Sequence, residues 1–106
     1  MNHPVLFFTC DFDERAAWEV EQKGFFEHAS VRLPNGVDIQ VSFWDPIRLS
    51  QDLETDFGRG EICFAELGLI IVPAVTVDNM KAAIAKLSKE GYFERLLTLN
   101  SPGSNR

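Results

Sequence analysis

Residues 28–44, HASVRLPNGVDIQVSFW, decide the fold, because apolar and polar side chains alternate on both sides of a central Pro-Asn-Gly. The alternating apolar positions are Ala29, Val31, Leu33, Val37, Ile39, Val41 and Phe43. A period of two is typical of strands that bury one face. The stretch therefore predicts two antiparallel strands joined by a tight turn.

The register of this hairpin follows from the length of its turn. A two-residue Asn35-Gly36 loop would pair Leu33 with Asp38 and place a carboxylate on the apolar face. A three-residue loop that begins at Pro34 pairs Leu33 with Val37 and keeps that face apolar. Because a slip of one residue turns every side chain to the other face, we expect the three-residue loop, with its glycine in the left-handed conformation.

Helix signals flank the hairpin. Asp45 is a good N-cap before Pro46, and an apolar stripe every four residues predicts a helix that Gly58 ends. Residues 76–91 predict the strongest helix, capped by Thr76, with Gly91 as its left-handed terminator. Residues 13–23 predict a further helix, capped by Asp11 or Asp13, with these side chains inward: Phe12, Ala16 and Val20.

The remaining apolar runs predict strands over residues 5–9, 62–66 and 69–72, the last two paired as a second hairpin. Residues 5–8 and 69–72 are apolar at every position, which indicates interior strands or an oligomer contact. Residues 92–98 fit either a short helix or an edge strand. The predicted order is β-α-β-β-α-β-β-α.

This order predicts an α+β fold, with a mainly antiparallel sheet and helices packed on one face. We expect one domain over residues 1–98 and a disordered tail over residues 99–106, which read NSPGSNR from residue 100. An apolar content of 45% with nine phenylalanines excludes intrinsic disorder. The residues match no family whose motifs we can name.

Charge and cysteine content restrict the kinds of partner and compartment. The net charge is −6, and residues 1–75 carry thirteen acids against five bases. An acidic body disfavours nucleic acid and favours a basic protein partner. Because no signal peptide or membrane span is evident, we expect a cytoplasmic protein with buried free thiols at Cys10 and Cys63, and a disulfide between them as the alternative.

The acidic stretch FFTCDFDE, residues 7–14, raises the question of thiol chemistry at Cys10. A helix N-terminus favours a thiolate, but the three carboxylates beside it disfavour one. We therefore interpret the stretch as the start of a capped helix, and a thiol-dependent enzyme or redox sensor using Cys10 is the alternative. No Cys-x-x-Cys or His-x-x-x-His spacing predicts a metal site, and no motif predicts a cofactor.

The candidate binding residues are aromatic and acidic. Trp44 continues the polar face of its strand, so it lies either on the open side of the sheet or over the core after a bend. Trp18 poses the same question. The acidic residues of the second helix form a negative patch or a merely solvated face: Asp52, Glu54 and Asp56.

Together these features predict a small acidic protein-binding domain without catalysis. Inhibitor or immunity proteins that neutralise a basic toxin or nuclease share this size and charge, which is an analogy only. The further alternative is a homo-oligomeric interaction module built on the strands that are apolar on both faces.

Overall fold

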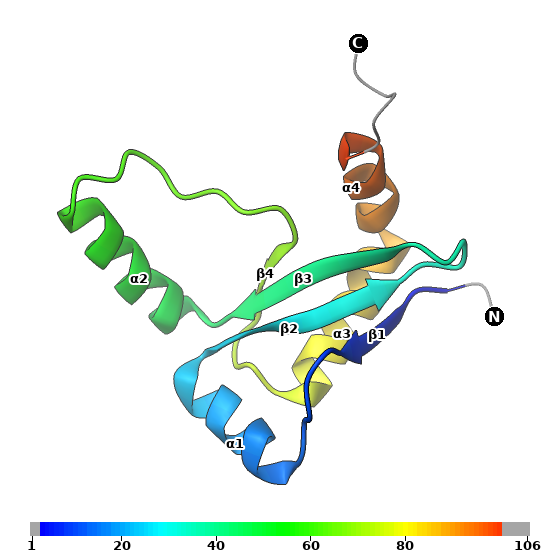
Figure 1. Ribbon diagram of the computed structural model, residues 1–106, viewed down its shortest axis with the longest axis horizontal. Helices are drawn as coiled ribbons and strands as arrows, with labels where there is room; N and C mark the ends of the chain where they lie inside the picture. The colour runs from blue at the N-terminus through cyan, green and yellow to red at the C-terminus, as the bar shows by residue number, and fades with distance from the viewer. Residues whose placement is uncertain (1–2, 101–106) are drawn as a thin grey trace.

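The computed structural model describes residues 3–100, and side chains as far as residue 97 (Figure 1). Four strands and four helices follow one another along the chain. In order they are β1 (Val5–Phe8), α1 (Glu14–Lys23), β2 (Phe25–Arg32), β3 (Asp38–Trp44), α2 (Pro46–Gly58), β4 (Leu69–Ile71), α3 (Val77–Lys89) and α4 (Tyr92–Asn100). The fold is α+β, as the sequence predicts.

The β2–β3 hairpin has the predicted register. Val31 pairs with Ile39, and the Leu33 amide donates to the Val37 carbonyl at 2.8 Å. Gly36 closes the turn with φ +90°, in the left-handed region where glycine has no steric penalty. A bulge follows farther along β2, where Glu27 and His28 together oppose Ser42 alone.

The sheet is mixed, with the strand order β1-β2-β3-β4. The β1–β2 and β2–β3 pairs are antiparallel, but β4 runs parallel to β3. The predicted second hairpin is wrong, because residues 62–66 form no strand and β4 pairs in parallel with β3 instead. In the described chain the outer edge of β4 carries no partner strand.

The interior position expected for the two wholly apolar strands is also wrong. In the described chain β1 and β4 are the two edge strands of the sheet. Val5 and Ile71 are accordingly about half exposed. Apolar residues at every position of these strands therefore do not reflect burial on both faces within one copy of the chain.

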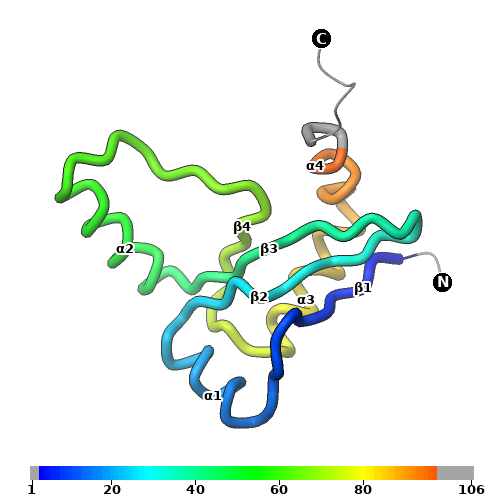
Figure 2. The backbone as a smooth tube through the Cα atoms, in the orientation of Figure 1, coloured from blue at the N-terminus to red at the C-terminus, as the bar shows by residue number. Residues whose placement is uncertain are grey.

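One face of the sheet carries the core. Figure 2 shows α3 and α4 lying behind the strands, and Met80, Ile84, Phe93 and Leu96 from these helices are buried against the apolar hairpin face. The aromatic rings of Phe8, Phe12 and Phe26 pack at one end of this core, next to α1. Residues 92–98 thus belong to a helix, one of the two alternatives.

The expectation that all helices pack on one face fails for α2. This helix projects sideways from the end of β3, and it makes no extensive contact with any other helix or strand (Figure 1). The radius of gyration, 14.9 Å, exceeds the roughly 13 Å of a compact domain of this length. The excess is consistent with a projecting element.

The helix ends follow their predicted caps. Asp13, Asp45 and Thr76 each accept a hydrogen bond from a backbone amide in the first turn of α1, α2 and α3. Gly91 is left-handed and α2 ends at Gly58, both as predicted, and Gly60 in the following loop has positive φ. The predicted tail begins inside α4 at residue 99, and residues 101–106 lie outside the described chain.

Candidate protein-binding surface

We call residues 46–68 the arm: α2 together with the loop 59–68 that leads back to β4 (Figure 1). Its base is held by hydrogen bonds to the end of α1. The Asp45 amide donates to the Gly24 carbonyl at 2.9 Å, and Arg48 Nη1 donates to the Lys23 carbonyl at 3.2 Å. The guanidinium carbon of Arg48 also lies 5.4 Å from the Phe25 ring centroid. Beyond this base the helix extends into solvent.

The apolar face of α2 is only partly covered, since Leu49 and Leu53 are half-buried and Phe57 is exposed. The helix carries the predicted stripe of Leu49, Leu53 and Phe57, yet it contains no buried residue, and Phe57 is 48% exposed. An amphipathic helix of a globular domain normally turns such a stripe into the core. The stripe of α2 is therefore available to another molecule.

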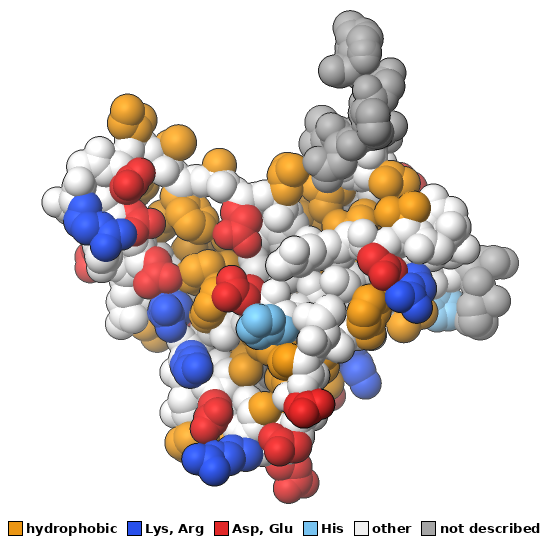
Figure 3. Space-filling model, in the orientation of Figure 1, with side chains coloured by type: hydrophobic (Ala, Val, Ile, Leu, Met, Phe, Trp, Pro, Cys, Tyr) orange, Lys and Arg blue, Asp and Glu red, His pale blue; other side chains and the backbone are white. Residues whose placement is uncertain are grey.

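The loop of the arm adds two strongly exposed apolar side chains. Ile62 is 94% exposed and Leu67 is 60% exposed. Figure 3 shows hydrophobic side chains beside acidic and basic ones on this part of the molecule. Single exposed apolar residues are ordinary on a protein surface, whereas several on one projecting element mark an interaction surface.

The predicted acidic residues all lie on α2, but two of them are paired within it. Arg48 Nε lies 3.1 Å from Asp52 Oδ1, and Arg59 Nη2 lies 2.9 Å from Asp56 Oδ1. Glu54 is exposed and makes no ion pair with any described residue. Ion pairing leaves the sum of charges unchanged, and the arm carries more acids than bases, so it presents a net negative charge.

Trp44 lies on the polar face of β3, as expected, but it is only 6% exposed. Its indole Nε1 donates to Ser42 Oγ at 3.2 Å, and Ser42 Oγ donates to Glu66 Oε2 at 2.7 Å. The rings of Phe25 and Phe64 lie against it, with centroids at 4.3 Å and 6.1 Å. The sequence left open whether Trp44 lies on the open side of the sheet or over the core after a bend; it lies on the side of Ser42, where the loop of the arm covers it.

Trp18 is 62% exposed on α1, so of the two positions that the sequence left open it has the exposed one. Among the described residues, no hydrogen bond or ring contact joins it to α2. The structure therefore places the three acids together on α2. Trp44 lies beneath the loop of the arm, and Trp18 lies on α1, a separate element.

Both cysteines are exposed free thiols, so the predicted burial is wrong, and the alternative disulfide is absent. Cys10 lies in the turn between β1 and α1, and Cys63 lies in the loop of the arm, where neither strand nor helix covers it. Cys10 and His28 line the same hollow of about 260 Å³, but no hydrogen bond joins the two side chains. A thiol that is activated by a base needs such a contact.

Comparison with known proteins gives no assignment: no family model, no curated protein and no solved structure matches the chain. Within residues 3–100, no group of three or more His, Cys, Asp or Glu side chains gathers to hold a metal ion. In the same range, no helix has both the length and the apolar character needed to cross a membrane.

The sequence contained a signal for the loop that we interpreted differently. Ile62 and Phe64 belong to the apolar pattern that predicted a strand, and Leu67 was assigned to the turn after it. In the structure Phe64 packs on Trp44, while Ile62 and Leu67 are exposed. The apolar residues of this segment therefore mark one contact with Trp44 and two exposed side chains in a loop.

Proposed function

We propose that the chain is a small cytoplasmic protein-binding domain without catalysis of its own, and that the arm contacts the partner. The observation that carries the proposal is that α2 buries none of its residues although one of its faces is apolar. Burial of apolar surface contributes about 25 cal/mol per Å², so covering this face would favour a complex.

The charges on the arm indicate the kind of partner. Residues 46–68 contain five acids and two arginines, and both arginines are paired with aspartates of the same helix. A surface that combines apolar pockets with basic residues would complement this composition. An inhibitor or immunity role against a basic protein fits this chemistry by analogy.

Site-specific photo-crosslinking tests the proposal in cells that naturally contain the chain. A benzophenone side chain at Ile62 is expected to give one adduct that contains a second, different protein. The same group at exposed Val37, in the β2–β3 turn, is the control and should not give that adduct. Equal adducts from both positions, or none from Ile62, would refute the arm as the contact surface. The third position for the benzophenone group is Trp18, the second candidate anchor for the partner.

A charge series tests the basic character of the partner that this crosslink identifies. Neutralising Asp52, Glu54 and Asp56 together should weaken binding at low salt and reduce its salt dependence. The matched control removes three acids from α1 instead, through the substitutions E14Q, E19Q and E21Q. If both variants bind alike, the negative charge of the arm has no specific role.

The thiol alternative has one supporting observation, the exposure of Cys10 beside the hollow that it shares with His28. Its test is the rate of Cys10 alkylation against pH in a Cys63→Ser background. A thiolate that forms well below the ordinary cysteine value of about 8.5 would favour an enzyme or redox sensor. Alkylation at an ordinary or higher pH would favour the binding role.

A further inference from the structure

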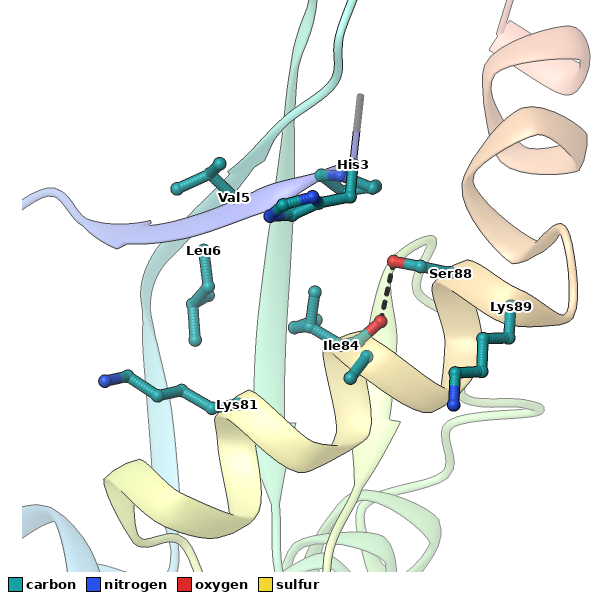
Figure 4. A pocket seen from close by; sticks show the side chains of 9 residues that line it. His3, Val5, Leu6, Lys81, Ile84, Ser88 and Lys89 are labelled. Atoms are coloured by element: carbon teal, nitrogen blue, oxygen red, sulfur yellow. Dashed lines mark hydrogen bonds between the residues drawn. The ribbon is translucent and has the colours of Figure 1, made fainter. Parts of the chain in front are cut away.

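A second surface, distinct from the arm, lies between β1 and α3. It is a groove of about 550 Å³ (Figure 4). Leu6 points from β1 toward α3, and Ile84 points from α3 toward β1, so the floor is apolar. Lys81 lies near the Leu6 end, and Ser88 and Lys89 lie near the His3 end.

One wall of this groove is an unprotected sheet edge. β1 has no partner strand on its outer side in the described chain, and its sequence VLFF contains no charged residue or proline. Native edge strands usually carry such residues, because an uncharged edge pairs readily with another extended chain. The edge therefore offers main-chain hydrogen bonds to a ligand.

The register identifies which groups face outward. The Thr9 amide donates to the His28 carbonyl at 2.9 Å, so Thr9 and every second residue before it bond to β2. Leu6 and Phe8 occupy the alternate positions. Their backbone N–H and C=O groups consequently point away from β2, toward the open edge.

The opposite wall is positively charged, in contrast to the rest of the molecule. Lys81 and Lys89 line the groove, and neither makes an ion pair with a described residue, whereas Lys86 on the same helix pairs with Glu90 at 2.6 Å. Lys89 turns away from β1 in Figure 4, but an exposed lysine changes rotamer within nanoseconds. Two unpaired cations beside an apolar floor favour a ligand with carboxylates.

The spacing of these cations matches an extended peptide. Lys89 comes eight positions after Lys81 on α3, which corresponds to a rise of about 12 Å along the helix. Residues i and i+4 of a strand are about 13 Å apart and point to the same face, with residue i+2 between them. Carboxylates at i and i+4 could therefore reach the two lysines while an apolar i+2 side chain contacts Ile84.

From these observations we propose that the groove between β1 and α3 binds an extended peptide that adds a strand to β1, with acidic residues at i and i+4 and an apolar residue at i+2. Main-chain hydrogen bonds to Leu6 and Phe8 supply part of the affinity, and the side chains supply the selectivity. The negative charge of the rest of the chain is screened beyond about 8 Å at physiological salt, so it does not prevent an acidic ligand from binding.

The test is a nuclear magnetic resonance titration of the full chain with the capped peptide Ser-Glu-Thr-Val-Thr-Glu-Ser. We expect shifts in the amides of β1 and α3, and slower hydrogen exchange at the Leu6 and Phe8 amides than in the free protein. Exchange of these two amides is decisive, because only pairing along the strand protects both. No shift at millimolar peptide, or shifts confined to the arm, would overturn the proposal.

Charge exchange provides the matched control. The double variant K81E/K89E should bind this peptide about tenfold more weakly, and it should prefer a peptide with lysines in place of the glutamates. K86E, on the same helix but outside the groove, should bind like the unchanged protein. Equal binding of both peptides to the unchanged protein would refute the charge pattern.

A small amphiphile with one carboxylate is the competing occupant, and decanoate is its probe. The peptide proposal expects decanoate to leave the exchange of Leu6 and Phe8 unchanged, since a fatty acid has no main chain to pair with β1. Decanoate that shifts the groove residues where the peptide does not would overturn the proposal and identify the groove as a lipid site.

Discussion

At the scale of single residues, Gly24 lies where the end of α1 meets the base of the arm. It ends α1 with φ +74°, and a Cβ built there would clash with the carboxylate of Asp45, the N-cap of α2. Gly24→Ala should therefore lose the left-handed preference, about 1–2 kcal/mol, and also disturb that cap. Gly36→Ala is the control, since Gly36 also has positive φ but open space around it. Urea denaturation should show the larger loss for Gly24→Ala.

Equal losses in the two variants would mean that the Asp45 side chain moves aside without cost. The base of the arm would then be less constrained than its hydrogen bonds indicate. Circular dichroism of both variants at low denaturant separates this outcome from a change in helix content.

The ion pair between Asp38 and Arg32 should make the stability of the hairpin depend on pH. Arg32 donates two hydrogen bonds to Asp38, Nε to Oδ1 at 2.7 Å and Nη2 to Oδ2 at 3.0 Å. These bonds hold the pKa of Asp38 below its ordinary value, and the positive charge of Arg32 adds to the effect. A lowered folded pKa adds stability above the unfolded value, about 3.9, and this stability is lost as the pH falls through the folded pKa.

Asp38→Asn should therefore reduce the loss of stability between pH 5 and pH 2, and lower stability at pH 7. The measurement is the urea midpoint at several pH values, with Asp11→Asn as a control whose carboxyl accepts no hydrogen bond from a described residue. An unchanged acid-side slope in Asp38→Asn would show that the exposed pair does not contribute to folding.

At the scale of elements, α2 and α3 have similar amphipathic sequences but different surroundings. Ile84 of α3 is buried in the core, whereas Leu53 is half-buried on α2, which makes no extensive contact with any other helix or strand. Ile84→Ala should cost about 2–5 kcal/mol of the free energy of unfolding, and Leu53→Ala less than about 1 kcal/mol. A loss in Leu53→Ala as large as that in Ile84→Ala would show that the stripe of α2 is buried within the folded chain.

The elements that could be predicted from the sequence are those whose signals are local. The alternation in residues 28–44 and the choice between two turn lengths depend only on neighbours, and both were confirmed. The caps of α1, α2 and α3 are equally local, since Asp13, Asp45 and Thr76 bond to amides three residues on. Turns and caps can be predicted because the residues that determine them lie within a few positions of one another.

The errors concern long-range pairing and burial. Residues 62–66 have the pattern of a strand, but β4 pairs in parallel with β3 and these residues form a loop, which no local pattern indicates. The position of Trp44 could not be decided for the same reason, because Phe64 in that loop is one of the residues that cover it. The acidic residues of the arm could be chosen from composition, whereas exposed Ile62 and Leu67 could not.

At the scale of the whole molecule, the arm and the groove are separate surfaces with opposite charge. The arm has a net negative charge beside an apolar stripe, and the groove has two unpaired lysines beside an apolar floor. A chain with both surfaces could hold two different partners. The charge-reversed groove variant should therefore leave crosslinking from Ile62 unchanged, and the neutralised arm variant should leave peptide binding to the groove unchanged.

Self-association decides between a partner protein and the homo-oligomer alternative. The net charge is −6, and two arms brought together would each contribute excess acids, so we expect a 12.0 kDa monomer by light scattering at micromolar concentration and low salt. Raising the salt screens this repulsion and should increase any association through the apolar stripe. Phe57→Ser with Ile62→Ser should abolish that increase. A stable dimer at low salt that survives both substitutions would instead favour an oligomer built on the apolar edge strands β1 and β4.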